Sequence, residues 1–407
     1  MSSGRVPQCL EGEFAVVSSK LVLVCLFASI FFAGNGVVFS WDLPCDSPGN
    51  PPEFLGYAGW NWTVLERLFG WRSVLRSLTM FDGKIVFRGA QDDREALFSY
   101  DPSTGMLLEC FATDWTICDF QVIDGMLYVV TGYASYPVYR GSVWSSADLV
   151  SWTLNASTDD MVPQSIGKYA DGTFKLAGCW SDGQGTRTRI ANLSEGLVTV
   201  IWTGSVWGSD DGLRITMFNE TQMVVLDAYP VNVIYSNDGV SWTDSESVST
   251  FDWPADAELR DGLLWIAAIP GTWRPDRAGL ACWNGSAMVS YDLGRCPWAL
   301  CDGYVSLSNE VLSFTTSPSS NASICSYNPD GSLGAKVLEI VCDGRIVGLA
   351  RDPGGDLLYA LAWVSFVEGQ DALYLLRGAL SLAIAEGRAV LAGLALATGA
   401  AHWVRSR

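Results

Sequence analysis

The stretch Asp82–Gly89 reads DGKIVFRG, a tight turn followed by an apolar strand, and this pattern returns along the chain. It recurs as DGMLYVVTG from Asp124 and as DGTFKLAG from Asp171. Further turns of the same kind begin at Asn219, Asp261, Asn309 and Gly354. The seven turns are 42 to 48 residues apart, so the sequence repeats one structural unit about seven times.

A second series of turns runs in phase with the first. Its members are Asp101–Gly105, Asp148, Ser194–Gly196, Asp238–Gly239, Asn284–Gly285 and Asn328–Gly331. Gly, Asn and Asp recur because tight hairpins need residues that tolerate positive φ. The runs between turns are short and rich in Val, Ile, Leu, Tyr and Trp, and amphipathic helical patterns are nearly absent. These features predict an all-β fold, a β-propeller of about seven four-stranded blades, with six or eight blades as alternatives.

The propeller is expected to span residues 71–385. The N-terminal segment 41–70 extends into a stretch, 52–75, with more than one strand's worth of residues, and we expect it to supply a strand that closes the last blade. Residues 386–407 imitate a blade turn at Glu386–Gly387 and are predicted to form C-terminal strands or a partial blade.

Residues 1–40 are predicted to be an export segment. The run Leu21–Ser40 is uncharged, and about 20 apolar residues are just enough to span a bilayer. Two interpretations remain open, a cleaved signal peptide or an uncleaved membrane anchor. Glu11 and Glu13 depart from the usual basic start of a signal peptide. Both interpretations place the rest of the chain outside the cell, either secreted or at the cell surface.

Glycosylation sequons agree with that compartment. Six asparagines begin an N-x-S/T sequon, where chance would give about two. They are Asn61, Asn155, Asn192, Asn219, Asn284 and Asn321. The sequence therefore predicts an N-glycosylated protein.

The cysteines favour disulfides over a zinc site. The chain contains no CxxC pair, and its one histidine is His402. Disulfides are predicted between Cys110 and Cys118 and between Cys325 and Cys342, because each pair is close in sequence. The nine cysteines beyond the export segment leave one thiol unpaired or joined between chains.

Charge and composition exclude some functions. Hydrophobic residues make up 49% of the 407 residues, enough for a large core. The net charge of −19 disfavours nucleic acid as a partner, because a polyanion is bound through a basic surface. The chain has no GxSxG, HExxH, P-loop or dinucleotide-binding motif. No cofactor, metal or catalytic residue is predicted.

Two turns of the second series resemble a known motif. Ser236–Trp242 reads SNDGVSW, similar to the Asp box of sialidase-like propellers, S-x-D-x-G-x-T-W, but one residue shorter. Ser146–Trp152 reads SADLVSW and lacks the glycine. The resemblance implies an extracellular propeller in which the aspartate accepts backbone hydrogen bonds and the tryptophan packs between blades. A sialidase would also need three convergent arginines, for which Arg94, Arg140 and Arg274 are the candidates.

Aromatic residues recur in the loop between the second and third strands of the predicted blades. This loop opens on the face opposite to both turn series. The aromatic residues are Tyr133, Tyr136, Tyr139, Trp180, Tyr229, Trp273 and Trp363. Exposed Trp and Tyr side chains are typical of surfaces that bind sugars or proteins. The alternative is that the rings pack between blades as core.

The leading functional hypothesis is a non-enzymatic surface or secreted protein that recognises a glycan or an extracellular protein through these aromatic residues. The first alternative is a sialidase-like or other glycan-cleaving hydrolase. The second is a structural coat or filament subunit, which ordered self-assembly would indicate.

Overall fold

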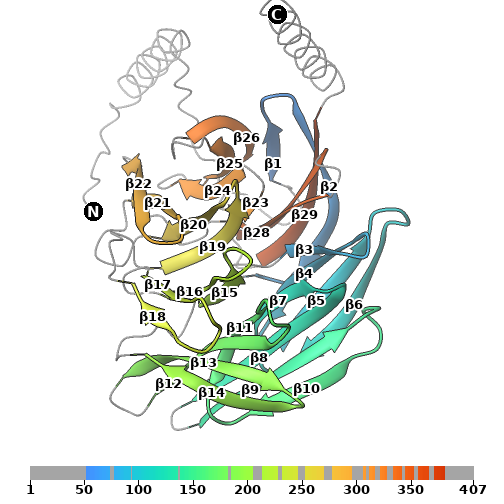
Figure 1. Ribbon diagram of the computed structural model, residues 1–407. Helices are drawn as coiled ribbons and strands as arrows, with labels where there is room; N and C mark the ends of the chain where they lie inside the picture. Colours follow the sequence, from blue (N-terminus) through green and yellow to red (C-terminus); the bar gives the residue numbers. More distant parts are fainter. Residues whose placement is uncertain are drawn as a thin grey trace, which may run out of the picture. The chain divides into compact units, whose positions relative to one another are not determined.

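The computed structural model describes residues 52–380, except for 74–77, 93, 136–137, 182–184, 205–212, 228–231, 246–252, 270–276, 296–305, 309–310, 317–320, 328–332, 342–343, 353–355 and 366–370. The predicted export segment 1–40 and the predicted partial blade 386–407 lie outside these residues. In the described part, the chain forms strands that assemble into seven antiparallel sheets (Figure 1).

Five of the sheets are four-stranded meanders in chain order. Blade 1 contains β3 (Leu78–Phe81), β4 (Lys84–Gln91), β5 (Arg94–Asp101) and β6 (Met106–Thr113). Blade 2 contains β7 (Thr116–Ile123), β8 (Met126–Ser135), β9 (Val138–Ser146) and β10 (Thr153–Thr158). Blade 3 contains β11 (Val162–Lys168), β12 (Phe174–Ser181), β13 (Thr186–Ser194) and β14 (Leu197–Thr203). Blade 4 contains β15 (Arg214–Met217), β16 (Met223–Asp227), β17 (Asn232–Ser236) and β18 (Thr243–Asp244). Blade 5 contains β19 (Trp253–Arg260), β20 (Leu263–Ile269), β21 (Arg277–Trp283) and β22 (Met288–Arg295).

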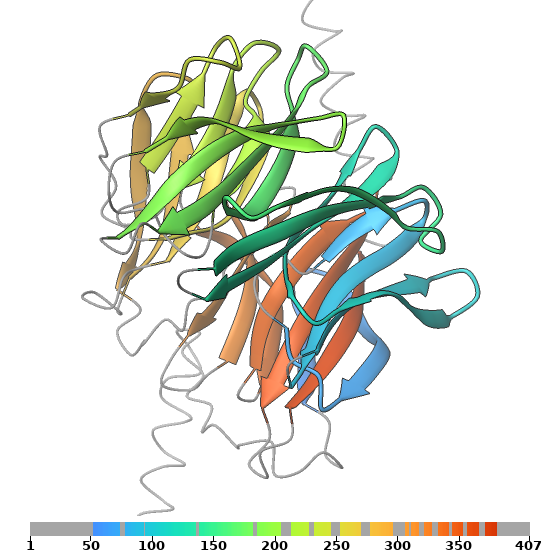
Figure 2. The ribbon, with the colours of Figure 1, turned by 90° about the horizontal axis from the view of Figure 1, so that it is seen from below.

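The last two sheets each take a strand from the N-terminal segment. Blade 6 contains β23 (Ser306–Ser308), β24 (Val311–Thr316), β25 (Asn321–Tyr327) and β26 (Leu333–Val341), with β1 (Glu53–Gly56) as a fifth strand. Blade 7 contains β27 (Gly344–Arg351), β28 (Leu357–Ser365) and β29 (Asp371–Leu380), with β2 (Trp60–Phe69) as its outermost strand. Figure 2 shows these blue N-terminal strands beside the orange strands of the last blades.

The sheets form a closed ring. First strands of successive blades contact one another, as in β7–β11–β15 and β23–β27–β3. Buried apolar clusters join blade 1 to 2, 2 to 3, 3 to 4, 4 to 5, 6 to 7 and 7 back to 1. Contacts of β19 and β20 with β23 join blades 5 and 6. The chain is a seven-bladed β-propeller.

The N-terminal segment fastens the ring at two places. β2 pairs with β29 over nearly its full length, from Trp60 opposite Leu380 to Phe69 opposite Ala372. The backbone N–H of Tyr57, between β1 and β2, and the indole N–H of Trp62 in β2 both donate to the carbonyl oxygen of Val337 in β26, each at 3.1 Å. Blades 6 and 7 are therefore tied together by residues 53–69.

The alternating strand directions give the ring two faces. The face that carries the turns between first and second strands and between third and fourth strands, such as Asp82–Gly83 and Asp238–Gly239, is called the turn face. The face that carries the loops between second and third strands and the connections between blades is called the crossover face. Tyr133, at the end of the second strand β8, lies on the crossover face.

Several turns of the turn face adopt the backbone that the sequence predicts. Asp82–Gly83, Asp124–Gly125 and Asp261–Gly262 each have two consecutive residues with positive φ, the requirement of a type I′ hairpin turn. Glycine tolerates this conformation without strain, which explains its place in the repeat.

The SNDGVSW and SADLVSW turns share one hydrogen-bond pattern. The Asp238 carboxylate accepts the backbone N–H of Val240 at 2.8 Å and of Ser241 at 2.6 Å. Asp148 accepts the equivalent pair at 2.8 and 2.7 Å. Each turn ends in a tryptophan that packs against the cluster shared with the preceding blade, and Trp152 also donates to the Cys110 carbonyl oxygen at 2.7 Å.

The missing glycine of SADLVSW is replaced by a strained leucine. Leu149 has φ of 64°, close to the 70° of Gly239, and its side chain is buried between blades 1 and 2. In the other turn a Cβ at Gly239 would lie 2.9 Å from the Tyr169 ring, which fills the corresponding space. Leucine is accepted at a left-handed position because its side chain joins the core.

Because of these turn carboxylates, we expect the protein to lose stability in acid. Backbone hydrogen bonds lower the pKa of Asp148 to about 2 and that of Asp238 further below its ordinary value. Because the folded pKa lies below the unfolded value near 3.9, the stabilisation is present above about pH 4 and lost as pH falls through 2. The melting temperature should therefore drop over this window. A D148N/D238N double variant should show a smaller drop, and an equal drop would contradict this assignment.

Candidate functional site

Three of the predicted aromatic residues lie on the crossover face, as the sequence predicts. Tyr133, Trp180 and Trp363 are at or near the ends of β8, β12 and β28, the second strands of blades 2, 3 and 7. Tyr133 is 46% exposed, whereas both tryptophans are half-buried. Tyr139 in β9 is half-buried as well. Tyr136, Tyr229 and Trp273 lie outside the described residues.

Trp180 is held by a cation on the neighbouring strand. The Arg189 guanidinium in β13 stacks over the Trp180 ring, with its central carbon 3.8 Å from the ring centroid. The same guanidinium donates to the carbonyl oxygen of Asp160, in the connection from blade 2. Burial lowers the pKa of Arg189, but arginine stays charged at neutral pH. The stack fixes a half-exposed indole and a cation together on the crossover face.

The surroundings of Trp363 favour the alternative in which the aromatic rings pack between blades as core. Its ring packs against the buried cluster that joins blades 7 and 1. The Arg345 guanidinium, on the paired strand β27, lies 5.0 Å from the ring centroid. This residue therefore has a structural role that Tyr133 lacks.

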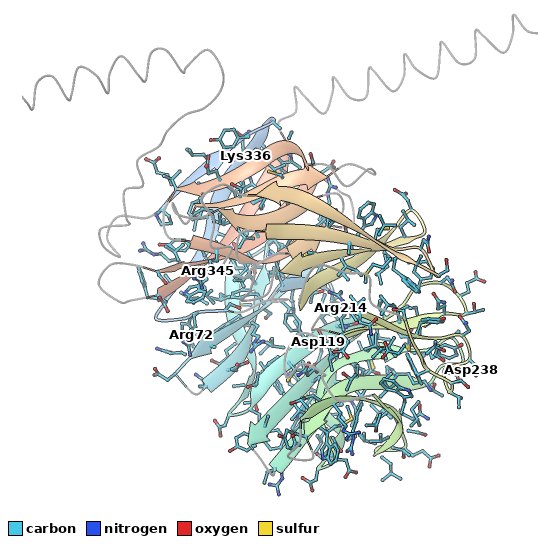
Figure 3. The ribbon with its side chains drawn as sticks, turned by 90° about the vertical axis from the view of Figure 1, so that its left-hand side faces the viewer. Arg72, Asp119, Arg214, Asp238, Lys336 and Arg345 are labelled. Atoms are coloured by element: carbon cyan, nitrogen blue, oxygen red, sulfur yellow. The ribbon has the colours of Figure 1, made fainter. Side chains whose placement is uncertain are left out.

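A buried polar network on the inner strands was not predicted from the sequence. Asp119 in β7 is 5% exposed, and its carboxylate accepts the Ser165 hydroxyl of β11 at 2.6 Å and the Gln121 amide at 2.7 Å. Ser165 in turn accepts the backbone N–H of Ile215 in β15 at 3.2 Å. The network thus joins the inner strands of blades 2, 3 and 4. Figure 3 shows Asp119 and Arg214 in the interior of the view and Asp238 at its periphery.

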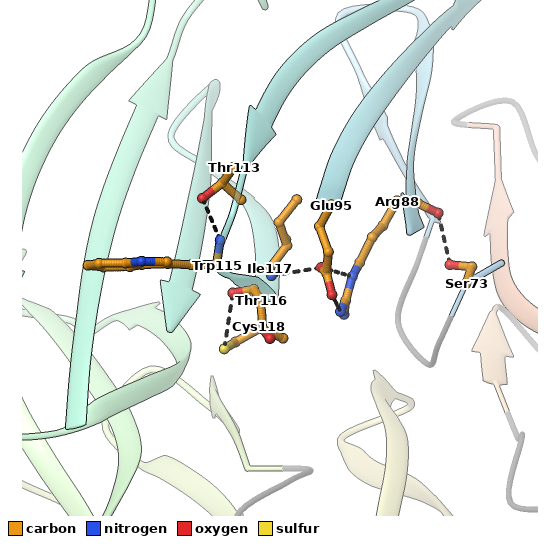
Figure 4. Close-up of polar contacts among 8 residues, drawn as sticks. All are labelled: Ser73, Arg88, Glu95, Thr113, Trp115, Thr116, Ile117 and Cys118. Carbon is orange, nitrogen blue, oxygen red and sulfur yellow. Dashed lines mark hydrogen bonds and ion pairs between the residues drawn. The ribbon is translucent and has the colours of Figure 1, made fainter. Parts of the chain in front are cut away.

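A second missed contact joins blades 1 and 2 (Figure 4). The buried Arg88 guanidinium binds the Glu95 carboxylate through two hydrogen bonds of 2.7 Å. Glu95 also accepts the backbone N–H of Ile117, in the first strand of the next blade, at 2.8 Å. Sequence spacing gave no signal for this pair, because charged residues at strand ends are usually solvated.

The candidate arginines do not form a triad in the described part of the chain. Arg94 forms an ion pair with Glu109 on the adjacent strand β6. Arg140 pairs with Asp159 at 2.9 Å, and both side chains are more than half exposed. Each guanidinium is thus engaged by a nearby carboxylate, and Arg274 lies outside the described residues. Neither described arginine has the surroundings of a catalytic group.

The six sequons differ in their surroundings. Asn219 and Asn284 occupy exposed turns on the turn face, where the side-chain oxygen accepts the sequon hydroxyl of Thr221 at 3.1 Å and of Ser286 at 3.0 Å. These turn hydrogen bonds use the side-chain oxygen and not the amide nitrogen, which is the atom that carries a glycan. The Nδ2 atom of Asn155 is instead buried.

Of the other sequons, Asn61 is exposed on β2, and Asn192 is half-buried and accepts the Lys175 ammonium at 2.6 Å. Asn321 begins β25, but its side chain is not among those described.

The structure does not show the predicted disulfide between Cys110 and Cys118, which stays a prediction. Cys110 in β6 donates its thiol to the Leu97 carbonyl oxygen at 3.3 Å, and Cys118 in β7 donates to that of Thr116 at 3.6 Å. Cys110 belongs to the outer strand of one blade and Cys118 to the inner strand of the next. Each thiol donates to a carbonyl oxygen near it. Cys325 is a buried thiol whose pKa burial raises to about 11, and Cys342 lies outside the described residues.

The described residues offer neither a metal site nor a membrane-spanning helix. The His, Cys, Asp and Glu side chains there do not gather into a group that could hold a metal ion. The same residues include no helix with the length and apolar character to cross a membrane.

Comparison with known proteins does not place the chain in a family. No protein-family model matches it, and no curated protein matches its sequence. Solved structures resemble it only distantly. A putative 6-phosphogluconolactonase from Bacteroides fragilis is 12% identical, with a TM-score of 0.49, over 73% of this chain and 91% of that one.

Two other solved structures are at a similar distance. Oligogalacturonate lyase from Vibrio parahaemolyticus is 11% identical, with a TM-score of 0.48, over 82% of this chain and 98% of that one. The sialidase of Trypanosoma rangeli is 12% identical, with a TM-score of 0.43, over 80% of this chain and 57% of that one. Likenesses this low say nothing of activity, and the fold assignment rests on the strand pairing.

Proposed function

We propose that this chain is an exported, N-glycosylated propeller, secreted or at the cell surface, that recognises a glycan or an extracellular protein through the crossover face of blades 2 and 3. The observation that carries the proposal is the pair formed by exposed Tyr133 on blade 2 and the Trp180–Arg189 stack on blade 3. The two blades are neighbours, joined by a common buried cluster.

The chemistry of this pair suits recognition. An aromatic ring covers the apolar face of a sugar or a side chain at little entropic cost, because it has only two rotatable bonds. The Arg189 stack restrains Trp180 before binding, and a restrained side chain loses less freedom when a ligand arrives. The Arg189 guanidinium adds hydrogen-bond donors beside the ring.

Export and glycosylation rest on the apolar run before residue 41 and on the sequons. The exposed Asn219 and Asn284 turns support modification, and both lie on the turn face. Glycans there would leave the crossover face clear for a ligand. We also propose that the two turns with the shared aspartate pattern are Asp boxes of a sialidase-like propeller, in a purely structural role.

A glycan-array screen of the secreted protein, followed by calorimetry with the best ligand, tests the function. Trp180→Ala and Tyr133→Ala should each weaken binding by about 2 kcal/mol, the scale of a hot-spot aromatic. Asp238→Ala should lower the melting temperature and leave affinity unchanged, because that turn lies on the other face.

The protein must come from its secreting host, where glycopeptides should contain modified Asn219 and Asn284 and unmodified Asn155. A folded protein whose Trp180 and Tyr133 variants bind as tightly as the original would exclude this surface. Protein that carries no N-glycan and stays inside the cell would instead overturn the export proposal.

A further inference from the structure

The turn face carries exposed aliphatic side chains that neither the core nor the proposed site uses. In blades 1, 2 and 3 the residue after the left-handed position of the second-series turn is apolar. These residues are Met106, Val150 and Leu197, which are 51%, 81% and 69% exposed. Leu108 and Leu154, near the starts of β6 and β10, are 50% and 48% exposed. These five residues together are called the rim patch.

The rim patch is continuous across the three blades because each second-series turn packs on the outer strand of the blade before it. Trp152, two residues after Val150, donates to the Cys110 carbonyl oxygen of β6 at 2.7 Å. A Cβ at Gly196, the residue before Leu197, would lie 3.5 Å from the Asn155 carbonyl oxygen of β10. The turns that carry Val150 and Leu197 thus each lie against the outer strand of the preceding blade.

Carboxylates alternate with these aliphatic side chains. Asp101, Asp148 and Glu195 belong to the same three turns, and Asp148 and Glu195 are exposed. Hydrogen bonds within the turns lower the pKa of Asp101 and Asp148, so both remain charged at neutral pH. The patch therefore presents apolar contacts and negative charge side by side.

The sequon inside the patch is blocked. Asn155 adjoins Leu154, but its amide nitrogen is buried, so a glycan there would be incompatible with the fold. The exposed turn sequons belong to blades 4 and 5. The other sequon of these blades, Asn192 in β13, is half-buried and its side-chain oxygen accepts the Lys175 ammonium. The rim patch therefore carries no exposed glycan acceptor and remains open to a large partner.

The charge decides between two kinds of partner. Apolar side chains at the tips of turns could enter a lipid surface, but fixed carboxylates beside them are repelled by anionic headgroups. A protein surface with Lys or Arg around apolar side chains complements both features. Scattered exposed aliphatic residues are common on proteins, but here they repeat at the same turn position in four contiguous blades, since Val240 of blade 4 follows left-handed Gly239 and is 67% exposed.

We propose that the rim patch is the docking surface for a protein partner with a basic surface and an apolar centre. It is independent of the crossover-face site, so the protein would bind a ligand on one face and a protein on the other. Its composition, with apolar side chains beside carboxylates, resembles that of an interface with a small apolar core and a charged rim.

Photo-crosslinking of the full chain in its own host tests this surface. A photoactivatable residue replaces Val150 or Leu197, and in the control it replaces Leu55, which is 39% exposed in β1 on blade 6, away from both proposed surfaces. Both patch positions should yield one discrete protein adduct whose crosslinked peptide contains several Lys or Arg residues, and position 55 should not.

Charge reversal provides the second readout. Glu195→Lys should lower the yield of that adduct from position 150 by about tenfold, the effect of about 1.4 kcal/mol in binding. Asp114→Lys, at an exposed position on the connection between β6 and β7, should leave the yield unchanged, and both variants should melt as the parent does.

Three results would overturn the proposal. They are no discrete adduct from either patch position, equal adducts from position 55, and a yield that Glu195→Lys does not change. Adducts formed with lipid in place of protein would show that the patch meets a membrane, and would equally reject a protein partner.

Discussion

Glu95→Ala is expected to lower the free energy of unfolding by about 3–5 kcal/mol, the cost of leaving a buried charge without its partner. The Arg88 guanidinium would lose both hydrogen bonds in a site where its side chain is 7% exposed. The variant also leaves the backbone N–H of Ile117 without its acceptor, which loosens the junction of blades 1 and 2. Urea denaturation of the purified protein measures the change.

Two variants separate this effect from a general sensitivity. Arg94→Ala removes the neighbouring pair with Glu109, whose two side chains are 50% and 36% exposed, and should cost less than about 1 kcal/mol. An Arg88→Met/Glu95→Leu double variant should recover much of the stability, because no buried charge remains. A single Glu95→Ala variant as stable as Arg94→Ala would show that the buried pair is not important.

Trp60→Ala is expected to destabilise the protein by about 3–5 kcal/mol, the usual cost of truncating a large buried aromatic side chain. Trp60 is 8% exposed at the start of β2 and packs in the cluster that joins blades 6 and 7. Loss of this anchor should release β2 from β29, so the amides of β29 should exchange with deuterium well before those of β28.

Phe69 provides the matched control for this prediction. It lies at the other end of β2 and is 47% exposed, so Phe69→Ala should cost less than about 1 kcal/mol. If Trp60→Ala left the exchange of β29 unchanged, ring closure would not depend on the N-terminal anchor.

The fold was predictable because its signals are local. A type I′ turn needs two residues with positive φ, and three of the Asp–Gly pairs of the repeat form it. Such turns at Asp82, Asp124 and Asp261 bound strands of the expected length, and their common period indicates the blade. The N-terminal closing strand was expected from surplus strand residues, but not the fifth strand β1 on blade 6.

Side-chain environments were less predictable, because they depend on contacts between blades. Leu149 takes a left-handed backbone that its sequence does not favour, since burial of the side chain compensates for the strain. Asp119 appears in the sequence as one of many acidic residues, yet it is buried and bonded to the next blade. Trp180 and Trp363 occupy equivalent positions near the ends of β12 and β28, and only the structure shows that Arg189 stacks on the first ring whereas the second packs on the cluster between blades 7 and 1.

The pairing of β2 with β29 also constrains how the protein is made. The two strands are about 310 residues apart in the chain, so closing the ring is among the last contacts that synthesis permits. Until β29 emerges, β2 has no partner for its backbone groups, and blade 7 lacks its outer edge. The loop-closure entropy grows with the logarithm of this separation and reaches about 5 kcal/mol for a chain of this length. A nascent chain that stalls before residue 371 would therefore present an open ring in which β2 has no partner strand. Such an exposed strand is a target for chaperones and proteases.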